Sequence, residues 1–378
     1  MARLRLRLRL LLLVAAVLLL LHHPALSSAT EGLEDPLIEQ VVGGDAENEL
    51  ELNAEAHFAS FVRRFGKSYR DADEHEHRLS VFRANLRRAR RHQRLDPSAV
   101  HGITKFSDLT PDEFRERFLG LRKSRRSFLK GISGSAHDAP ALPTDGLPTE
   151  FDWREHGAVG PVKDQGSCGS CWSFSTSGAL EGANYLATGK LEVLSEQQLV
   201  DCDHECDPSE PRACDAGCNG GLMTTAFSYL AKAGGLETEK DYPYTGRNSA
   251  CKFDKSKIAA QVKNFSTVAI DEDQIAANLV KHGPLAIGIN AVFMQTYIGG
   301  VSCPYICGRH LDHGVPGWLW ISWLRTAPLQ GETILDHKEL MGRELGRERV
   351  LQDLQGSTCQ KQVRCRFHGL HGYRHPYL

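Results

Sequence analysis

The chain has almost no net charge and lacks an apolar run long enough to cross a bilayer. Lys and Arg number 45 against 47 for Asp and Glu, which leaves a formal net charge of −2. A nearly neutral chain is poorly suited to nucleic acid as its main partner, because polyanions are bound through an excess of basic side chains. The apolar run Leu10–Leu21 falls short of the roughly 20 residues that span a bilayer.

That run predicts a cleaved export signal rather than a membrane anchor. Four arginines precede it, and the small residues Ala25, Ser27 and Ser28 follow it. A basic start, a short apolar stretch and a small-residue cleavage region are typical of a secretory signal peptide. We therefore expect residues 1–28 to be a signal peptide and the protein to enter the secretory pathway. Its destination would be a vacuole/lysosome or the extracellular space, with no membrane segment left after cleavage.

The chain contains eleven cysteines. Cysteines at this number in an exported chain predict disulfides, because the compartment is oxidising. The odd count leaves at least one cysteine outside any disulfide. The length of 378 residues predicts more than one domain.

The stretch Gln165–Phe174, Q-G-S-C-G-S-C-W-S-F, indicates a nucleophile at the start of a helix. Gly166 and Gly169 permit a tight turn, and residues compatible with a helix follow. A thiol in a first helical turn lies near the positive end of the helix dipole, which lowers its pKa and favours the reactive thiolate. Cys171 is therefore the candidate nucleophile. Gln165 could donate its side-chain amide to an oxyanion that forms beside it.

A Cys-x-x-Cys pair also occurs in redox-active dithiols and in half of a zinc site, so Cys168 and Cys171 leave those alternatives open. His313, within L-D-H-G-V, lies about 140 residues downstream. Its near-neutral imidazole is well matched to a thiol as a general base. C-G-S-C-W followed by a histidine at this distance resembles the papain-like cysteine proteases.

The resemblance implies an α+β fold, with a helical half and a β-barrel-like half, over a peptidase domain at residues 147–315. It implies a cysteine-type endopeptidase, a hydrolase without cofactor or metal, in which Cys171 attacks the scissile carbonyl, His313 is the base and Gln165 helps to bind the oxyanion. It also assigns four glycines to the substrate cleft: Gly220, Gly221, Gly288 and Gly314. The expected partners are protein and peptide substrates, the chain's own propeptide and cystatin-type inhibitors, and the expected state is a monomer.

The segment before the peptidase domain resembles the inhibitory propeptide of the same family. Six of its residues recur three or four positions apart and so share one helix face: Glu74, Arg78, Phe82, Asn85, Ala89 and Gln93. An ordinary amphipathic helix would show the same spacing, but Gly102–Asp108, G-I-T-K-F-S-D, is similar to the second propeptide motif. The pattern resembles the cathepsin F-like branch of plant vacuolar type. We expect a zymogen with its propeptide at 29–146 and the inhibitor domain at about 56–120.

Six cysteines are expected in three disulfides: Cys168–Cys218 and Cys202–Cys251, by the family resemblance, and Cys206–Cys214, within an insertion. Four of these thiols, together with His204, could instead hold zinc. An exported protein favours disulfides over that alternative. Asn264 begins N-F-S, a glycosylation sequon that export makes usable.

The chain departs from the family after His313. The family orients that histidine with an Asn in an Asn-Ser-Trp segment some twenty or more residues downstream, and no asparagine follows Asn290. A shifted reading frame accounts for this difference. Suitable codons for Thr333–Arg349, read one base later, encode P-Y-W-I-I-K-N-S-W-G-E-N-W-G-E-N, and the same treatment of Val350–Gln355 gives Y-Y-K-I-C.

We therefore interpret residues 316–378 as an aberrant, frame-shifted tail. We expect it to leave the β half without its last strands, and the chain to be inactive for lack of the orienting asparagine. The intact propeptide motifs favour a second hypothesis, a catalytically dead inhibitor of related cysteine proteases. A redox dithiol protein is a third hypothesis, and it requires Cys168 as a free thiol.

Overall fold

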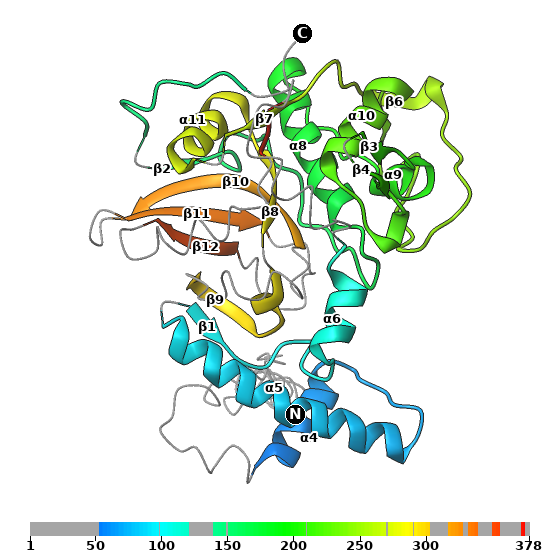
Figure 1. Ribbon diagram of the computed structural model, residues 1–378, viewed down its shortest axis with the longest axis vertical. Coiled ribbons are helices and arrows are strands. Elements are labelled where there is room, and N and C mark those ends of the chain that lie inside the picture. Colours follow the sequence, from blue (N-terminus) through cyan, green and yellow to red (C-terminus); the bar gives the residue numbers. More distant parts are fainter. Residues whose placement is uncertain are drawn as a thin grey trace, which may run out of the picture. The chain divides into compact units, whose positions relative to one another are not determined.

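The computed structural model describes residues 53–97, 99–120, 139–148, 150–208, 210–269, 271–289, 291–302, 317–327, 332–338, 350–355 and 372–374 (Figure 1). All of them belong to one unit, Val41–Leu378. The expected signal peptide, the basic part of the linker at 121–138, His313 and Gly314 lie outside the described residues. Within the described residues, no helix combines the length and the apolar character needed to cross a membrane.

The described part of the propeptide contains three helices and one strand: α4 (Ala54–Arg64), α5 (Ala72–Leu95), β1 (Ala99–His101) and α6 (Pro111–Phe118). Aromatic rings hold α4 against α5. The rings of Phe58 and Phe61 lie 5.3 and 5.1 Å from the ring of Phe82. The two helices are separated at Gly66, whose φ of +57° is a left-handed conformation that favours glycine.

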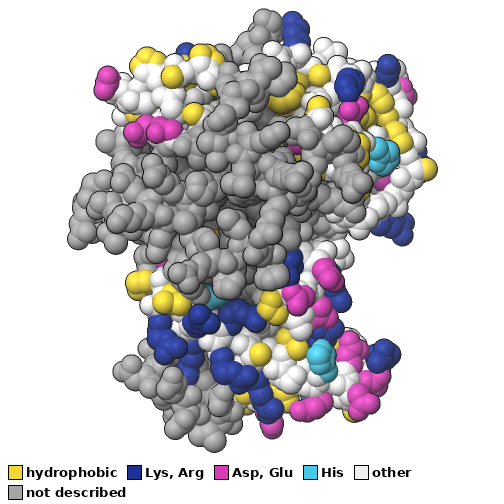
Figure 2. Space-filling model, viewed as in Figure 1, with side chains coloured by type: hydrophobic (Ala, Val, Ile, Leu, Met, Phe, Trp, Pro, Cys, Tyr) yellow, Lys and Arg dark blue, Asp and Glu magenta, His cyan; other side chains and the backbone are white. Residues whose placement is uncertain are grey.

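The helix face predicted from the sequence holds the segment that follows α5. Asn85 donates from Nδ2 to the carbonyls of Ser107 and Leu109 at 2.7 and 2.8 Å. Gln93 donates from Nε2 to the carbonyl of Ala99 at 2.8 Å. These contacts confirm that the residues share a face, and they explain why it carries amides. Basic side chains gather on the solvent side of the same helix (Figure 2), including the exposed arginines Arg87, Arg91 and Arg94.

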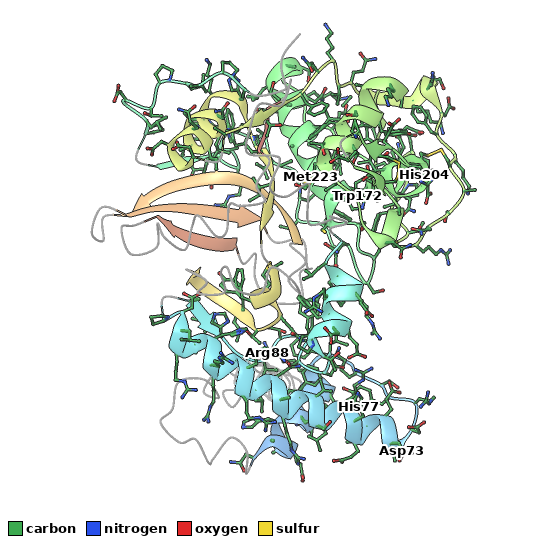
Figure 3. The ribbon with its side chains drawn as sticks, viewed as in Figure 1. Asp73, His77, Arg88, Trp172, His204 and Met223 are labelled. Atoms are coloured by element: carbon green, nitrogen blue, oxygen red, sulfur yellow. A yellow bond between two sulfur atoms is a disulfide. The ribbon has the colours of Figure 1, made fainter. Side chains whose placement is uncertain are left out.

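The first half of the peptidase domain contains three helices, two short 3-10 turns and four short strands: α8 (Cys171–Thr188), α9 (Glu196–Cys202), β3 (Cys206–Asp207), β4 (Glu210–Cys214), η1 (Gly217–Asn219), α10 (Met223–Ala233), β5 (Leu236–Glu237), η2 (Lys255–Lys257) and β6 (Ile258–Ala260). Trp172 of α8 and Met223 of α10 are fully buried in its core (Figure 3). Ser195 caps α9 by accepting from the backbone N–H of Gln198, as its sequence predicts.

The second half is built on a nine-stranded sheet, covered by α11 (Glu272–His282). Its remaining elements are β2 (Glu150–Asp152), β7 (Ser266–Val268), β8 (Leu285–Ile289), η3 (Ala291–Gln295), β9 (Tyr297–Ser302), β10 (Gly317–Ala327), β11 (Glu332–Lys338), β12 (Val350–Gln355) and β13 (Gly372–Arg374). The strand order is β1-β9-β12-β11-β10-β8-β13-β7, with β2 paired to β10. The propeptide thus contributes its strand β1 to the sheet of the peptidase domain.

The sequence predicts that residues 316–378 cannot supply the last strands of the β half, and β10 to β13 are four strands within that segment. β10 pairs antiparallel with β8, with Trp320 opposite Ala286. Its sequence, G-W-L-W-I-S-W-L-R-T-A, is rich in aromatic and aliphatic residues, which favour extended chain whatever reading frame encoded them. The departure from the family therefore concerns the identity of these residues, above all the missing asparagine.

Candidate active site

Cys171 is the first residue of α8, where the sequence predicts it. Its side chain is 2% exposed, and it is the one cysteine among the described residues that is outside a disulfide. The positive end of an 18-residue helix lies at this thiol, which favours the thiolate. The neighbouring Trp172 donates from its indole N–H to the carbonyl of Gly217 at 3.1 Å. The first turn of α8 is therefore held against the loop that carries Gly220 and Gly221.

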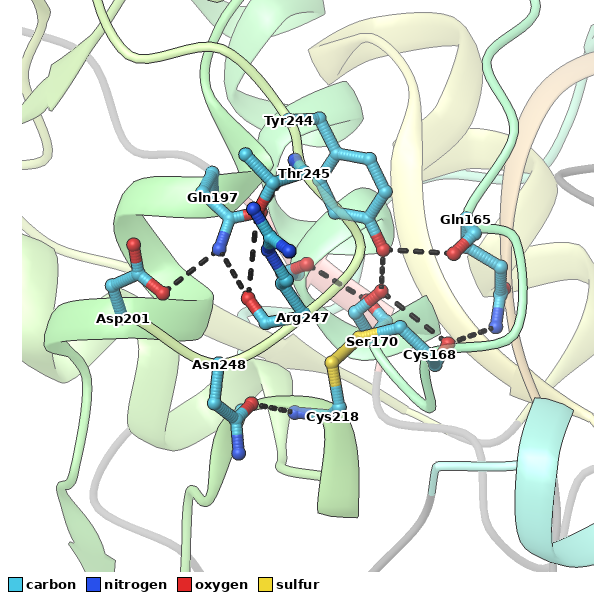
Figure 4. The surroundings of a disulfide bond; sticks show 12 residues. Gln165, Cys168, Ser170, Gln197, Asp201, Cys218, Tyr244, Thr245, Arg247 and Asn248 are labelled. Carbon is cyan, nitrogen blue, oxygen red and sulfur yellow. Dashed lines mark hydrogen bonds between the residues drawn. A yellow bond between two sulfur atoms is a disulfide. The ribbon is translucent and has the colours of Figure 1, made fainter. Parts of the chain in front are cut away.

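The described residues contain all three expected disulfides: Cys168–Cys218, Cys202–Cys251 and Cys206–Cys214. The first of them joins the segment before α8 to the loop that carries Gly220 and Gly221, called the glycine loop below (Figure 4). Cys168 is therefore not the free thiol that the redox hypothesis requires. The thiols of the zinc alternative are all in these disulfides, so they are not available as metal ligands.

Gln165 lies where it can bind a carbonyl oxygen next to Cys171. The side chain is 1% exposed, and its Nε2 donates to the carbonyl of Cys168 at 2.9 Å. The same Nε2 donates at 3.1 Å to the carbonyl of Phe118, the last residue of the propeptide helix α6. The carbonyl of Phe118, in the propeptide, thus accepts a hydrogen bond from the Gln165 amide that is expected to bind the oxyanion.

The propeptide continues from Phe118 along the glycine loop. The carbonyl of Gly120 accepts from the backbone N–H of Gly221 at 3.0 Å. A Cβ at Gly120 would lie 1.8 Å from the carbonyl oxygen of Gly169, and one at Gly220 would lie 2.4 Å from the carbonyl oxygen of Gly120. Neither position has room for a Cβ, so Gly120 and Gly220 allow the two backbones to lie against each other.

The remaining predicted cleft residues are not brought together by the described contacts. Gly288 lies in β8, opposite Trp318 of β10. Gly314 and the predicted base His313 lie outside the described residues. Asn264 is exposed after β6, as a glycosylation site requires.

Comparison with known proteins agrees with this geometry. The family "Papain family cysteine protease" matches residues 147–320, and the "Cathepsin propeptide inhibitor domain (I29)" matches residues 58–114. Cysteine proteinase 1 of Zea mays is 77% identical over 299 residues, which are 79% of this chain and 81% of that protein. The chain belongs to the papain family of cysteine proteases. A probable cysteine protease of Arabidopsis thaliana, RD19C, is 65% identical over 76% of this chain and 75% of its own length.

Solved proforms and a cathepsin F extend the comparison. The proform of the ragweed pollen cysteine protease Amb a 11 has a TM-score of 0.66 and 31% identity, and the match covers 88% of this protease and 97% of that chain. Cathepsin F of Drosophila melanogaster is 42% identical over 68% of this protease. The plant relatives and this cathepsin confirm the predicted resemblance to plant enzymes and to cathepsin F. The family match ends at residue 320, close to where the sequence predicts the aberrant tail.

An ion cluster joins Lys163 to carboxylates of α8 and α9, and sequence reasoning did not find it. Lys163 Nζ lies 2.8 Å from Glu181 Oε1 and 2.6 Å from Glu196 Oε1. Both carboxylates are almost completely buried. Burial raises the pKa of Glu196 to about 7, although Lys163 opposes that shift. Lys163, Glu181 and Glu196 are far apart in the sequence, so no sequence motif predicts the cluster.

A buried carboxyl supports the glycine loop itself. Asp215 Oδ1 accepts from the backbone N–H of Leu222 at 2.7 Å. Burial, followed by the charge of the neighbouring Asp203, raises the pKa of Asp215 to about 9. Burial beside Asp203 therefore favours the protonated form of Asp215 in the folded protease.

Two buried histidines connect the propeptide to the peptidase domain. His92 Nδ1 of α5 lies 2.8 Å from Thr296 Oγ1, and His101 Nδ1 of β1 lies 3.1 Å from the same oxygen. Burial, and then the charge of His101, lowers the pKa of His92 to about 3. The interface therefore favours a neutral His92.

Proposed function

We propose that the chain is the zymogen of a cysteine endopeptidase in which Cys171 is the nucleophile and His313 the general base. The observation that carries the proposal is the contact between Gln165 Nε2 and the carbonyl of Phe118, 3.1 Å long. It places a peptide carbonyl on a buried amide donor, and the thiol of Cys171 begins the adjacent helix. A substrate carbonyl in the same place would have an oxyanion donor and a nucleophile at hand.

The reaction follows from these roles. His313 takes the thiol proton, and the thiolate of Cys171 attacks the scissile carbonyl to form a tetrahedral oxyanion. Gln165 and the backbone N–H of Cys171 stabilise that charge. The C–N bond then breaks, and the imidazolium of His313 protonates the leaving amine. Water hydrolyses the resulting thioester and restores the thiol. Gly220 and Gly221, with Gly288 and Gly314, would line the cleft.

Latency has a direct basis in the contacts of the propeptide. The carbonyls of Phe118 and Gly120 already accept hydrogen bonds from Gln165 and from the N–H of Gly221. A substrate therefore cannot bind to these two donors at the same time. We place the signal peptide at 1–28, the propeptide at 29–146 and the peptidase domain from 147. Cleavage in the linker after residue 120 would allow the propeptide to leave. These assignments fit a monomer that enters the secretory pathway and ends in a vacuole, a lysosome or the extracellular space. Cystatin-type inhibitors would bind the cleft once the propeptide has left.

The test compares the chain as written with a chain whose tail is encoded in the other frame. After acid treatment, we expect hydrolysis of a peptide amide by the frame-restored protein and loss of hydrolysis in its Cys171→Ser variant. The chain as written lacks an asparagine after Asn290, so we expect it to hydrolyse the peptide at least about 100-fold more slowly, because a wrongly oriented imidazole is a poor base. Equal rates for the two tails would refute the role given to the asparagine.

A second function is supported by the intact propeptide. The face of α5 and the residues at 118–120 are complete, whereas the orienting asparagine is missing. We propose, as the alternative, that the chain inhibits related cysteine proteases through this segment. Tight inhibition of a related plant protease by residues 56–130 would support it. Absence of inhibition, together with peptide hydrolysis by the chain as written, would exclude it.

A further inference from the structure

Tyr244 reaches both sides of the proposed oxyanion site with one hydroxyl group. Its OH donates to the backbone carbonyl of Gln165 at 2.9 Å and lies 2.6 Å from Ser170 Oγ (Figure 4). Gln165 carries the amide donor, and Ser170 immediately precedes Cys171. One phenol oxygen therefore connects the two residues whose separation sets the distance between oxyanion donor and nucleophile.

The direction of both hydrogen bonds follows from their chemistry. A backbone carbonyl only accepts, so the single phenol hydrogen is used on Gln165. Ser170 Oγ lies 2.6 Å from the phenol oxygen and 3.5 Å from the carbonyl of Cys168. The shorter contact assigns its hydrogen to the phenol oxygen, which has no other hydrogen to place between the two hydroxyls. Burial raises the pKa of Tyr244, which keeps the phenol protonated over the whole working range of a protease.

Tyr244 is itself firmly placed. Its backbone N–H donates to Glu239 Oε1 at 2.8 Å, and the N–H of Thr245 donates to Gln197 Oε1 at 2.8 Å. Its ring packs edge-on against Phe174 of α8, with centroids 4.9 Å apart. The hydroxyl is thus presented from a fixed backbone, so it can position the residues that it contacts rather than follow them.

We propose that Tyr244 is a positioning residue of the peptidase reaction, which holds Gln165 and the first turn of α8 at the separation that oxyanion binding requires. The role rests on the proposed function of Cys171 and Gln165. It does not involve contact with substrate. Without the hydroxyl, the thiol keeps its place on the helix, but the amide donor is no longer held at a set distance from it.

The test separates reactions of the thiol that use the oxyanion site from those that do not. A peptidyl aldehyde becomes tetrahedral when the thiol adds to it, whereas iodoacetamide alkylates the thiol at a saturated carbon. Both are applied to the full chain after acid treatment, which releases the propeptide from Gln165 and the loop of Gly221, and adducts at Cys171 are measured by mass spectrometry. We expect Tyr244→Phe to weaken aldehyde binding about tenfold, and to leave the alkylation rate within about twofold.

Tyr242→Phe is the matched control. It removes a hydroxyl from the same segment, which donates to Asp201 Oδ2 at 2.9 Å and does not touch Gln165 or Ser170. We expect it to change neither reaction. Ser170→Ala removes the other partner of Tyr244, and its side chain makes no capping bond to α8, so it should reproduce the effect even if Tyr244→Phe folds poorly.

Two results would overturn the proposal. If Tyr244→Phe and Ser170→Ala bind the aldehyde as tightly as Tyr242→Phe does, Tyr244 has no positioning role. If they slow alkylation as much as they weaken aldehyde binding, its role is general stability. An acid-treated protein without substitutions, freed of its propeptide, that is alkylated at Cys171 but forms no aldehyde adduct contradicts the proposed function itself, and the role of Tyr244 fails with it.

Discussion

The backbone N–H of Gly221 donates to the carbonyl of Gly120 at 3.0 Å, so the propeptide is hydrogen-bonded to the loop expected to bind substrate. The contact depends on the absence of side chains. A Cβ at Gly120 would lie 1.8 Å from the carbonyl of Gly169, and this backbone oxygen cannot move away easily. Inhibition of the cleft therefore depends on one glycine of the propeptide.

We expect Gly120→Ala to weaken the closed state by about 1–3 kcal/mol, the usual cost of overpacking. Alkylation of Cys171 at neutral pH should become roughly tenfold faster or more. Gly299→Ala is the control, because a Cβ there meets no atom within 4 Å although the residue faces Val100 of the propeptide across the sheet. Equal alkylation of the two variants would show that Gly120 does not hold the cleft closed.

Acid should release the propeptide through His92. Its pKa is about 3 in the docked state and about 6.5 when exposed, so the released state binds more protons. The docked state therefore keeps its full stability above pH 6.5 and loses up to about 1.4 kcal/mol per pH unit as the pH falls towards 3. The groups facing His92 are His101, Arg88, Arg91 and Asp96.

Alkylation of Cys171 as a function of pH measures this release. We expect it to accelerate as the pH falls from 6.5, after correction for the ionisation of the thiol in a peptide standard. His92→Gln should flatten the acceleration, whereas His77→Gln, on the exposed side of α5, should leave it unchanged. An identical pH profile for all three proteins would remove His92 as the cause.

Lys163→Met should destabilise the protease strongly, because it leaves Glu181 and Glu196 buried without their cation. Loss of one partner of a buried ion pair costs about 3–5 kcal/mol. The exposed pair Lys190–Glu192 provides the control, and Lys190→Met should cost less than about 1 kcal/mol. Urea unfolding measures both. The loss in Lys163→Met should shrink in acid, as Glu196 becomes protonated.

Asp215→Asn should stabilise the protease at neutral pH. The folded-state pKa of Asp215 is raised to about 9, so folded stability is lost as the pH rises from about 4, where the unfolded group ionises. An asparagine keeps the acceptor for the N–H of Leu222 and removes the titration. Urea midpoints measured from pH 4 to 8 should diverge steadily between the two proteins. Parallel curves would show that Asp215 is ionised in the folded state.

Local features were predictable from the sequence, and long-range contacts were not. The sequence predicts the start of a helix at Cys171, and α8 begins there. A cap such as Ser195 on α9 depends on residues only three apart, so it is open to the same kind of reasoning. The disulfides followed from the family resemblance. The contact of Gln165 with Phe118 joins residues 47 apart, so only folding reveals it.

The buried groups were missed for a related physical reason. Glu196, His92 and Asp215 are ordinary charged or polar residues in the sequence, and what distinguishes them is burial beside specific partners. The strands at 316–378 show the opposite error, because here the structure has elements that the sequence does not predict. Extended structure requires residue types that favour it and a neighbouring strand, and β8 supplies β10 with one even though the tail departs from the family.

The place of β1 at one end of the strand order has a consequence for maturation. β1 pairs with β9 through Ala99, Val100 and His101. When the propeptide leaves, β9 becomes an edge strand whose free backbone groups can pair with an extended segment of another molecule. In the precursor the edge at this end is β1, which has three residues, and activation exposes β9, which has six, in its place. The mature protease therefore presents a longer strand edge than its precursor for pairing between two copies.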